Sequence, residues 1–530
     1  MHIACKCKGL PHTVVIFAGI LSIIERYCWQ EFADSLSSST SMKTEPLELS
    51  YSHLPEYLKP CLLYFGAFRE DQDIPVQRLL WLWISEGFVQ KTEGKSLDDM
   101  AEDYLMDLVS RSLVTVTKQR TTGGAKTCRI HDLVHEFCLA KAKNEGFLQI
   151  LHGDSDISTF TGPCPHRLCI YLIKEEELEK MRLYFPNLRC LFVFSYYHWN
   201  FSWKVIKLRD GSPGFPVLKL LRVLDLGDFD FGTSFPMEVV FLAHLRFLAI
   251  HGHMKDIPSA IDNLSRLETF LVKGNFDAVV LPNSIWNIKT LRHLWTTNSS
   301  MWCGFCLPID NVEVSTHLDH LNTLSLAVDP FSQSLQDILT KLPSIRRLKC
   351  VTVRSEAKSP GNCNRILTLD KLTSLQSLKL QRFVGYEFEY PFNLKKLTLS
   401  FNHQPWSKMS AIGELPNLKV LKLECNSFVG EKWEMEEGEF PNLRFLKFSR
   451  LDICLWIAPS YSFLRLEKLV LYECAKLQEV PSSLGKCENL ELIELRGCCE
   501  SAVSSVKQIQ QEQVSTGSQD LKIVIRATVD

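Results

Sequence analysis

A short pattern of leucines recurs from about residue 187 to residue 497 and constrains this chain more than any other feature. The pattern is L-x-x-L-x-L, as in Leu221-Arg-Val-Leu-Asp-Leu226 and Leu418-Lys-Val-Leu-Lys-Leu423. Weaker copies start at Leu188, Leu267, Leu291, Leu321, Ile345, Leu375, Leu394 and Leu443. Most successive copies are about 19 to 30 residues apart. Because a unit of this length cannot bury its own apolar side, each unit must stack on its neighbours.

The spacing of the leucines within each unit indicates a strand. Leu-x-Leu at the end of a unit is the alternation of a strand, whereas an amphipathic helix repeats its apolar residues every three or four positions. We therefore predict an α/β fold, a leucine-rich-repeat solenoid, over residues 187–500. A polar residue three positions after the last leucine should point inward and satisfy buried backbone groups. This slot falls on Asn275, Asn402, Asn426, Cys474 and Cys498.

Composition limits which classes of partner and which cellular compartment we expect for this chain. The 530 residues have a net charge of -2, which argues against nucleic acid as the main partner because phosphate neutralisation needs clustered Lys and Arg. The 19 cysteines are scattered through core-like positions, which favours reduced thiols in a cytoplasmic protein. The apolar run 13–24 is too short to span a bilayer, so we expect no stable membrane insertion.

The part before the repeats has the pattern of a mostly helical domain with one hairpin. We expect helices over 54–68, 76–88, 97–113 and 131–145, and hairpin strands over 113–117 and 127–130. Helices followed by a two-stranded hairpin predict a winged-helix domain. DNA binding is disfavoured because the helix before the wing is acidic. Its acidic residues are Asp98, Asp99, Glu102, Asp103 and Asp107.

The chain is therefore divided into five segments. These are a helical fragment at 1–40, the winged-helix domain at 41–150, a linker or first irregular repeat at 151–186, the repeats at 187–500 and a tail at 501–530.

Four motifs in this order resemble those of a known family. Lys8-Gly-Leu-Pro-His12 resembles the GLPL motif, and Leu54-Pro-Glu-Tyr-Leu-Lys-Pro-Cys-Leu-Leu-Tyr64 resembles the motif that opens the family's winged helix. Leu82-Trp-Ile-Ser-Glu-Gly-Phe88 is similar to LWIAEGF, and Ile130-His-Asp132 is similar to MHD. The chain thus resembles the plant nucleotide-binding leucine-rich-repeat immune receptors of the coiled-coil class, in particular the late blight resistance type of nightshade plants.

The resemblance implies a nucleotide site, but the printed sequence lacks its main element. In the family, ADP contacts the MHD histidine and the GLPL proline, which by position are His131 and Pro11. No G-x-x-x-x-G-K-[ST] occurs in the chain, so we expect the nucleotide-binding core to have been lost or to lie outside this sequence. We therefore expect no cofactor, and interpret His131 and Pro11 as packing residues, with Asp132 capping the following helix. The alternative is an ADP/ATP-binding switch whose P-loop lies upstream.

Two further patterns bear on function. Cys303-Gly-Phe-Cys306 matches half a zinc site, but no second C-x-x-C supplies the other ligands, so we interpret it as an insertion loop and predict no metal. No ordered set of nucleophile and base is present, which predicts a protein that is not an enzyme.

The most credible binding surface is the concave face of the repeats, where side chains beside the buried leucines should face solvent. The predicted recognition residues are Lys379, Gln381, Lys422, Glu424, Lys447, Ser449, Tyr472, Glu494 and Arg496. The resemblance implies defence by protein recognition, with a pathogen effector or a guarded host protein as partner and an internal contact between repeats and winged helix. A non-enzymatic repeat adaptor, such as one serving a ubiquitin ligase, remains a second alternative.

Overall fold

The computed structural model describes most of the chain from residue 45 onward. The described residues are 45–121, 123–152, 165–172, 187–195, 218–274, 278–297, 304–306, 319–328, 334–353, 365–515 and 521–526, with residues 14, 18, 19, 29 and 185. Within the chain two compact units are distinct: Met1–Gly252 with Ala260–Lys273, and His253–Ser259 with Gly274–Asp530. The helical fragment predicted at 1–40 lies almost wholly outside the described residues.

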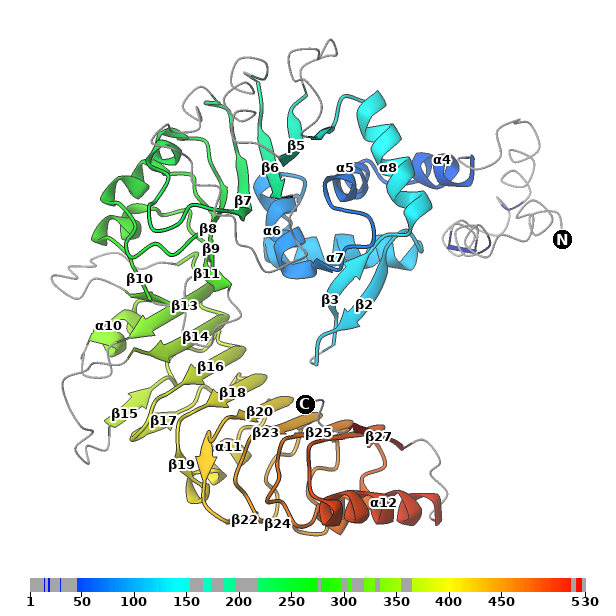
Figure 1. Cartoon of the computed structure of the whole chain (residues 1–530), viewed down its shortest axis with the longest axis vertical. Helices are drawn as coiled ribbons and strands as arrows, with labels where there is room; N and C mark the ends of the chain where they lie inside the picture. The colour runs from blue at the N-terminus through cyan, green and yellow to red at the C-terminus, as the bar shows by residue number, and fades with distance from the viewer. Residues whose placement is uncertain are drawn as a thin grey trace. The chain divides into compact units, whose positions relative to one another are not determined.

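The first unit begins with a group of short helices (Figure 1). They are α4 (Glu45–Ser52), α5 (Lys59–Leu63), the 3-10 helix η2 (Tyr64–Ala67), α6 (Val76–Glu86), α7 (Leu97–Ser110) and α8 (Asp132–Asn144). The helical block predicted over 54–68 is confirmed only from Lys59 to Ala67, where α5 is followed directly by η2. Pro55 disfavours helical angles at Leu54, so one helix ends at Ser52 and the next begins at Lys59. Gly87, in the left-handed conformation at φ 84°, ends α6.

The wing follows α7 as the sequence predicted. Strands β2 (Thr115–Gln119) and β3 (Ala125–Arg129) form an antiparallel hairpin, which confirms the predicted strands with a shift of about two residues. Gly123 and Gly124 turn the chain with φ of 85° and 81°, angles that other residues rarely adopt. A third strand, β1 (Ile74–Pro75), pairs with β3 and was not predicted because two residues give no alternation.

The first unit continues into parallel repeat strands. They are β4 (Gln149–His152), β5 (Arg167–Leu172), β6 (Cys190–Ser195), β7 (Val223–Asp230), β8 (Phe247–His251) and β9 (Thr269–Lys273), each pairing with the next. The 3-10 helix η5 (Met237–Phe241) lies between β7 and β8. The repeat leucines Leu224 and Leu248 are opposite each other in the ladder and fully buried, so they form a continuous core.

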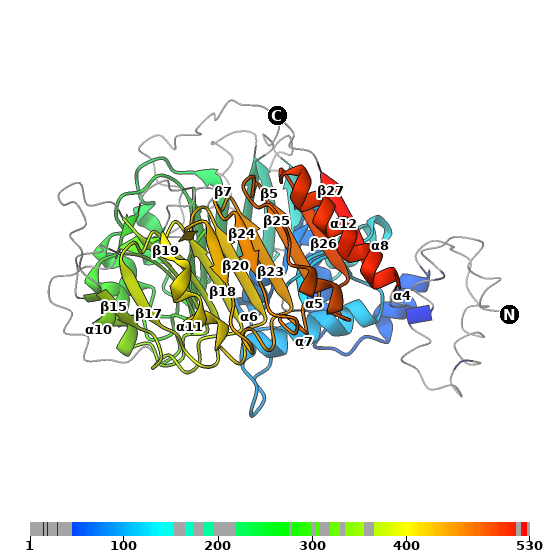
Figure 2. The same ribbon diagram turned by 90° about the horizontal axis from the view of Figure 1, so that it is seen from below.

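The second unit consists of the remaining repeats. Its ladder comprises β10 (Val279–Val280), β11 (His293–Thr297), β12 (Phe305–Cys306), β13 (Thr323–Val328), β14 (Arg347–Thr352), β16 (Ser377–Gln381), β18 (Lys396–Ser400), β20 (Val420–Glu424), β23 (Phe445–Ser449), β25 (Lys468–Tyr472), β26 (Leu492–Arg496) and β27 (Lys522–Arg526). All pairings from β13 to β27 are parallel, and Figure 2 shows the strands from β18 to β27 side by side. The ladder therefore continues beyond residue 500 into β27.

Short elements form the opposite side of each repeat in the second unit. The helices are α10 (Ser334–Thr340), α11 (Ser410–Gly413), α12 (Glu500–Ser515), η7 (Asn283–Asn287), η8 (Trp406–Lys408) and η9 (Ser482–Lys486). The strand pairs are β15 (Arg365–Thr368) with β17 (Tyr386–Glu389), β19 (Gln404–Pro405) with β21 (Phe428–Val429), and β22 (Lys432–Glu434) with β24 (Leu455–Ile457). A further 3-10 helix, η6 (Ser259–Asn263), has residues in both units. Between these elements and the ladder, Trp433 stacks on Trp406 and Trp456 with ring centroids 5.2 and 5.4 Å apart.

The predicted inward slot is occupied in some repeats and not in others. Asn402 is fully buried, and its Oδ1 accepts a hydrogen bond from the Phe383 amide at 3.2 Å, as predicted. Cys474 is also fully buried. The prediction is wrong for Asn426, which is exposed, because Cys425 and Asn426 both adopt positive φ and turn Ser427 inward instead. Asn275 lies outside the described residues.

Candidate functional site

The register of the second unit aligns the predicted recognition residues into two rows. We call the side of the sheet opposite the buried leucines the ladder face. One row comprises Lys379, Thr398, Lys422, Lys447, Val470 and Glu494, and the other comprises Gln381, Ser400, Glu424, Ser449, Tyr472 and Arg496. Neighbouring residues in a row are separated by one strand spacing, about 4.8 Å. All nine predicted residues therefore lie on one continuous surface.

Exposure differs among these nine residues. Seven are partly exposed, whereas Gln381 and Ser449 are buried, with exposed fractions of 1% and 7%. The prediction that every one faces solvent is therefore wrong for these two. Ser449 is covered because it lies between the longer side chains of Glu424 and Tyr472. Gln381 lies between Val351 and Ser400 on the two adjacent strands. Because adjacent strands are only about 4.8 Å apart, their side chains shield Gln381 from solvent.

One carboxylate lies among the lysines of the ladder face. The Lys447 Nζ is 2.9 Å from the Glu424 Oε1, and the Ser400 hydroxyl donates to Oε2 at 3.5 Å. Burial raises the pKa of Glu424, but Lys447 and the other nearby lysines outweigh burial and hold that pKa below its ordinary value. Burial lowers the pKa of Lys379, an effect that Glu424 partly opposes.

A second group of charges surrounds Tyr472. The guanidinium groups of Arg450 and Arg496 lie 5.8 and 5.4 Å from its ring centroid, within the range of cation–π attraction. Arg450 also donates to Glu473 at 2.5 Å. Sequence reasoning identified Tyr472 and Arg496 from their place in the repeat, and it missed Arg450, which follows the strand rather than belonging to it.

His131 lies at the start of α8 in the first unit. It is the N-cap residue, and its Nδ1 accepts a hydrogen bond from the Leu133 amide at 3.3 Å. The prediction that Asp132 caps this helix is therefore wrong: Asp132 is the first helical residue, where its charge complements the helix dipole. Pro11 lies outside the described residues. Both the packing role expected of His131 and Pro11 and the nucleotide contact that the resemblance implies stay predictions.

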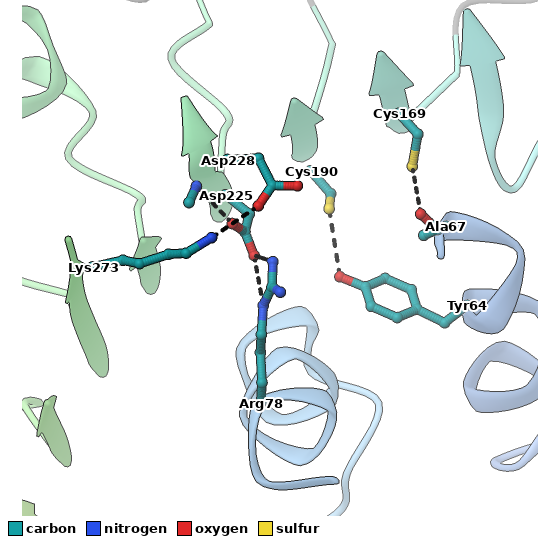
Figure 3. A network of polar contacts seen from close by, with 9 residues as sticks. Tyr64, Ala67, Arg78, Cys169, Cys190, Asp225, Asp228 and Lys273 are labelled. Carbon is teal, nitrogen blue, oxygen red and sulfur yellow. Dashed lines mark hydrogen bonds and ion pairs between the residues drawn. The ribbon is translucent and has the colours of Figure 1, made fainter. Parts of the chain in front are cut away.

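Within the first unit, the winged helix contacts the first repeats through a buried polar network that the sequence did not reveal (Figure 3). Arg78 on α6 donates to the carboxylate of Asp225 on β7, with the Nε 3.1 Å from Oδ2. Near it, the Tyr64 hydroxyl and Cys190 sulfur are 3.5 Å apart. Arg167 on β5 donates from Nε and Nη2 to both oxygens of Glu86, each at 3.1 Å. The only available signal was an acidic residue between Leu224 and Leu226, where a repeat strand has its outward position.

The C-x-x-C pattern lies only partly within the described residues. Cys303 lies outside the described residues, and Cys306 lies in β12. Among the described residues, no cluster of three or more His, Cys, Asp or Glu is arranged to hold a metal ion. No helix in the described ranges has both the length and the apolar character needed to cross a membrane.

Comparison with known proteins matches both parts of this architecture. The family described as "Leucine-rich repeat region" matches residues 218–516, and the one described as "Disease resistance protein Winged helix domain" matches residues 67–138. Late blight resistance protein R1-A of Solanum demissum is 34% identical over 97% of this chain and 40% of its own length. The homolog R1B-16 of the same species gives the same three values. The chain thus spans about 40% of the length of these relatives.

Among solved structures, the chain is similar to a leucine-rich-repeat protein of Leptospira interrogans. The two are 15% identical, the match covers 73% of this chain and 98% of the other, and the TM-score is 0.32.

Proposed function

The chain belongs to the leucine-rich-repeat family, and on this premise we propose that it acts in plant disease resistance by recognising protein at its ladder face. The observation that supports the proposal most is the aligned rows of charged and polar side chains from β16 to β26. Such a surface offers many weak contacts over a long distance, as extended solenoid sheets do when they bind protein. The similarity to late blight resistance proteins supports defence as the process.

The proposed activity is binding in the cytoplasm, without catalysis. The partner is a pathogen effector or a host protein that an effector attacks. The ladder face combines cations, a carboxylate and an aromatic ring, groups that suit a protein surface.

The proposal is tested by loss of the gene and by complementation in the plant that carries it. Loss should increase pathogen growth in infected leaves, and the wild-type chain should restore resistance and local cell death. A ladder-face variant, Lys379→Glu with Lys422→Glu, should fail to restore it. The matched control, Lys371→Glu with Lys476→Glu, reverses the charge of two exposed lysines outside the ladder and should restore resistance.

Two results would contradict the proposal. Unchanged growth of fungal, oomycete, bacterial and viral pathogens after loss of the gene would exclude a role in resistance. Full complementation by the ladder-face variant would show that recognition takes place elsewhere on the chain.

A further inference from the structure

The last strand of the ladder, β27, has a partner on one side only. Each strand of the ladder from β14 to β26 pairs in parallel with a strand on both sides. Among the described residues, β27 pairs only with β26. Figure 2 shows β27 beyond β26 at the end of the row, with α12 beside it. One edge of β27 is therefore available for a further strand.

The backbone of β27 has hydrogen-bonding groups on this outer edge. In a parallel strand, alternate residues direct their N–H and C=O groups to opposite sides. The Lys522 N–H donates to the Glu491 carbonyl at 2.9 Å, so alternate residues of β27, starting with Lys522, bond to β26. The N–H and C=O groups of Ile523 and Ile525 therefore point away from β26. They are the groups to which an added strand would bond.

The side chains of the same two isoleucines lie on the core side of the sheet but are not fully covered. They are opposite Ile493 and Leu495, which are 0% and 1% exposed. Ile523 is only partly buried and Ile525 is 47% exposed, because no further strand of the described residues stacks on them. The terminal repeat of a solenoid usually has a polar outer face, which keeps it soluble. The outer face of β27 is instead apolar on its core side.

The opposite side of β27 carries two cations. Lys522 and Arg526, the first and last residues of the strand, are exposed, and neither forms an ion pair with another described residue. Arg526 is directly opposite Arg496 on β26, which is also a cation. A strand added at the outer edge would place its own side chains beside Lys522 and Arg526, about 4.8 Å away. Opposite charges at such cross-strand positions stabilise a sheet, whereas like charges destabilise it.

These features together specify the segment that fits the edge. Successive side chains of a strand point to opposite faces. The added segment therefore needs apolar residues against Ile523 and Ile525, and acidic residues at the alternate positions beside Lys522 and Arg526. A second copy of β27 fits poorly, because antiparallel pairing about Val524 would place the positive ends of the two strands against each other.

We propose that the outer edge of β27 binds an extended segment of another protein in which apolar and acidic residues alternate. Main-chain hydrogen bonds to the edge would provide affinity, and the alternating side chains would provide specificity. This surface lies beyond the rows from β16 to β26, so the proposal goes beyond recognition at the ladder face.

Direct binding to the full chain tests the proposal. The probe is a fluorescein-labelled decapeptide of alternating valine and glutamate, measured by fluorescence anisotropy at low and high NaCl. One control peptide has lysine in place of glutamate. A second has the probe's composition with its residues in pairs, which puts glutamate on both faces of a strand. We expect the probe to bind at least about tenfold more tightly than either control at low salt, and more weakly as salt rises.

Backbone variants test whether the strand edge itself is used. Ile525→Pro removes an N–H that points outward, so it should weaken binding of the probe by about tenfold or more while the bonds to β26 remain. Ile525→Ala keeps that N–H and should weaken binding less. Val524→Pro removes an N–H that bonds to β26 and should lower the melting temperature, which Ile525→Pro should change little.

Charge variants test the acidic part of the code. Lys522→Glu with Arg526→Glu should weaken binding of the probe by about tenfold or more, because two attractive contacts become repulsive. Lys371→Glu with Lys476→Glu changes the net charge by the same amount outside the ladder and should leave binding unchanged.

Other outcomes would overturn the proposal. Absence of binding, or equal binding of the three peptides, would show that the edge does not select this segment. Equal weakening by Ile525→Pro and Ile525→Ala would mean that the backbone edge is not used. Loss of binding in the variant Lys379→Glu with Lys422→Glu would place the peptide on the ladder face instead. A dimer of the full chain that Ile525→Pro dissociates would assign the edge to a second copy.

Discussion

Arg78 on α6 and Asp225 on β7 are 147 residues apart in sequence and share hydrogen bonds in the folded first unit. Asp225 is buried, and its other oxygen accepts from the Gly227 amide at 3.1 Å. The pair therefore joins the winged helix to the first repeats by an ionic contact in which Asp225 is buried and Arg78 is partly exposed. Such a contact adds little net stability compared with an apolar pair. Removing one partner, however, leaves the other as a buried charge without a counter-ion, which is strongly destabilising.

Arg78→Leu should lower the free energy of unfolding of the first unit by about 3–5 kcal/mol, because Asp225 stays buried without its cation. The double variant Arg78→Leu with Asp225→Leu should recover most of that loss, since no charge remains buried. Chemical denaturation of the full chain, monitored by hydrogen exchange of the amides in α6 and β7, measures the stability of both variants. A double variant as unstable as the single one would show that the ion pair itself stabilises the contact.

The strand assignment of the repeats predicts opposite outcomes for two adjacent residues. Leu423 is fully buried, opposite Leu399 and Phe448 in the ladder, whereas Lys422 is partly exposed. Leu423→Asp should cost several kcal/mol because it buries a carboxylate without a partner. Lys422→Asp should change stability by less than about 1 kcal/mol, since it also ends the repulsion from Lys447. Equal shifts in melting temperature would contradict the observed alternation.

Glu424 predicts how the second unit responds to acid. Its pKa in the folded chain lies below the ordinary 4.5 because Lys447 and its neighbours outweigh burial. A group whose pKa is lowered by folding stabilises the fold when ionised, so its contribution is present above about pH 4.5 and is lost as pH falls through the lowered value. Glu424→Gln should therefore be less stable than the wild type near pH 6, with the difference narrowing towards pH 3. A constant difference across that range would show that the carboxylate charge is not involved.

The repeats could be predicted from sequence because their signal is physical and periodic. Leu421 and Leu423 are buried and Lys422 is not, as the alternation requires, and every predicted recognition residue lies on the same face. The two errors on that face, Gln381 and Ser449, depend on which side chains lie on the neighbouring strands. The sequence of one strand does not reveal how long the side chains are that lie beside it on the neighbouring strands. The burial of single residues within a row could therefore not be derived from the repeat pattern.

The resemblance implied a contact between the winged helix and the repeats, but the residues that form it could not be predicted, for a related reason. Arg78 and Glu86 look like ordinary polar residues of an amphipathic helix, and Asp225 and Arg167 look like ordinary polar positions of repeat strands. Their pairing depends on how separate elements pack, which no local pattern specifies. The helix ends were predicted more closely, except where Pro55 interrupts the segment 54–68.

His131 predicts the response to nucleotide. Its Nδ1 is used in capping α8, so the imidazole could offer a phosphate at most one hydrogen bond. One hydrogen bond to a charged group contributes roughly 1.5–3 kcal/mol, whereas even millimolar affinity needs about 4 kcal/mol. High affinity needs backbone amides and a lysine around the phosphates, and the chain has no G-x-x-x-x-G-K-[ST] to provide them. We therefore expect no ADP or ATP binding by calorimetry at micromolar concentrations of this 530-residue chain.

Two variants separate capping from nucleotide contact at this position. His131→Ala should cost about 1 kcal/mol through loss of the N-cap, and His131→Ser should restore most of it, because a serine hydroxyl caps well. Neither should alter the calorimetric signal with ADP. Micromolar binding of ADP by the wild-type chain, abolished by both variants, would instead make His131 a nucleotide contact and this chain a nucleotide-binding switch.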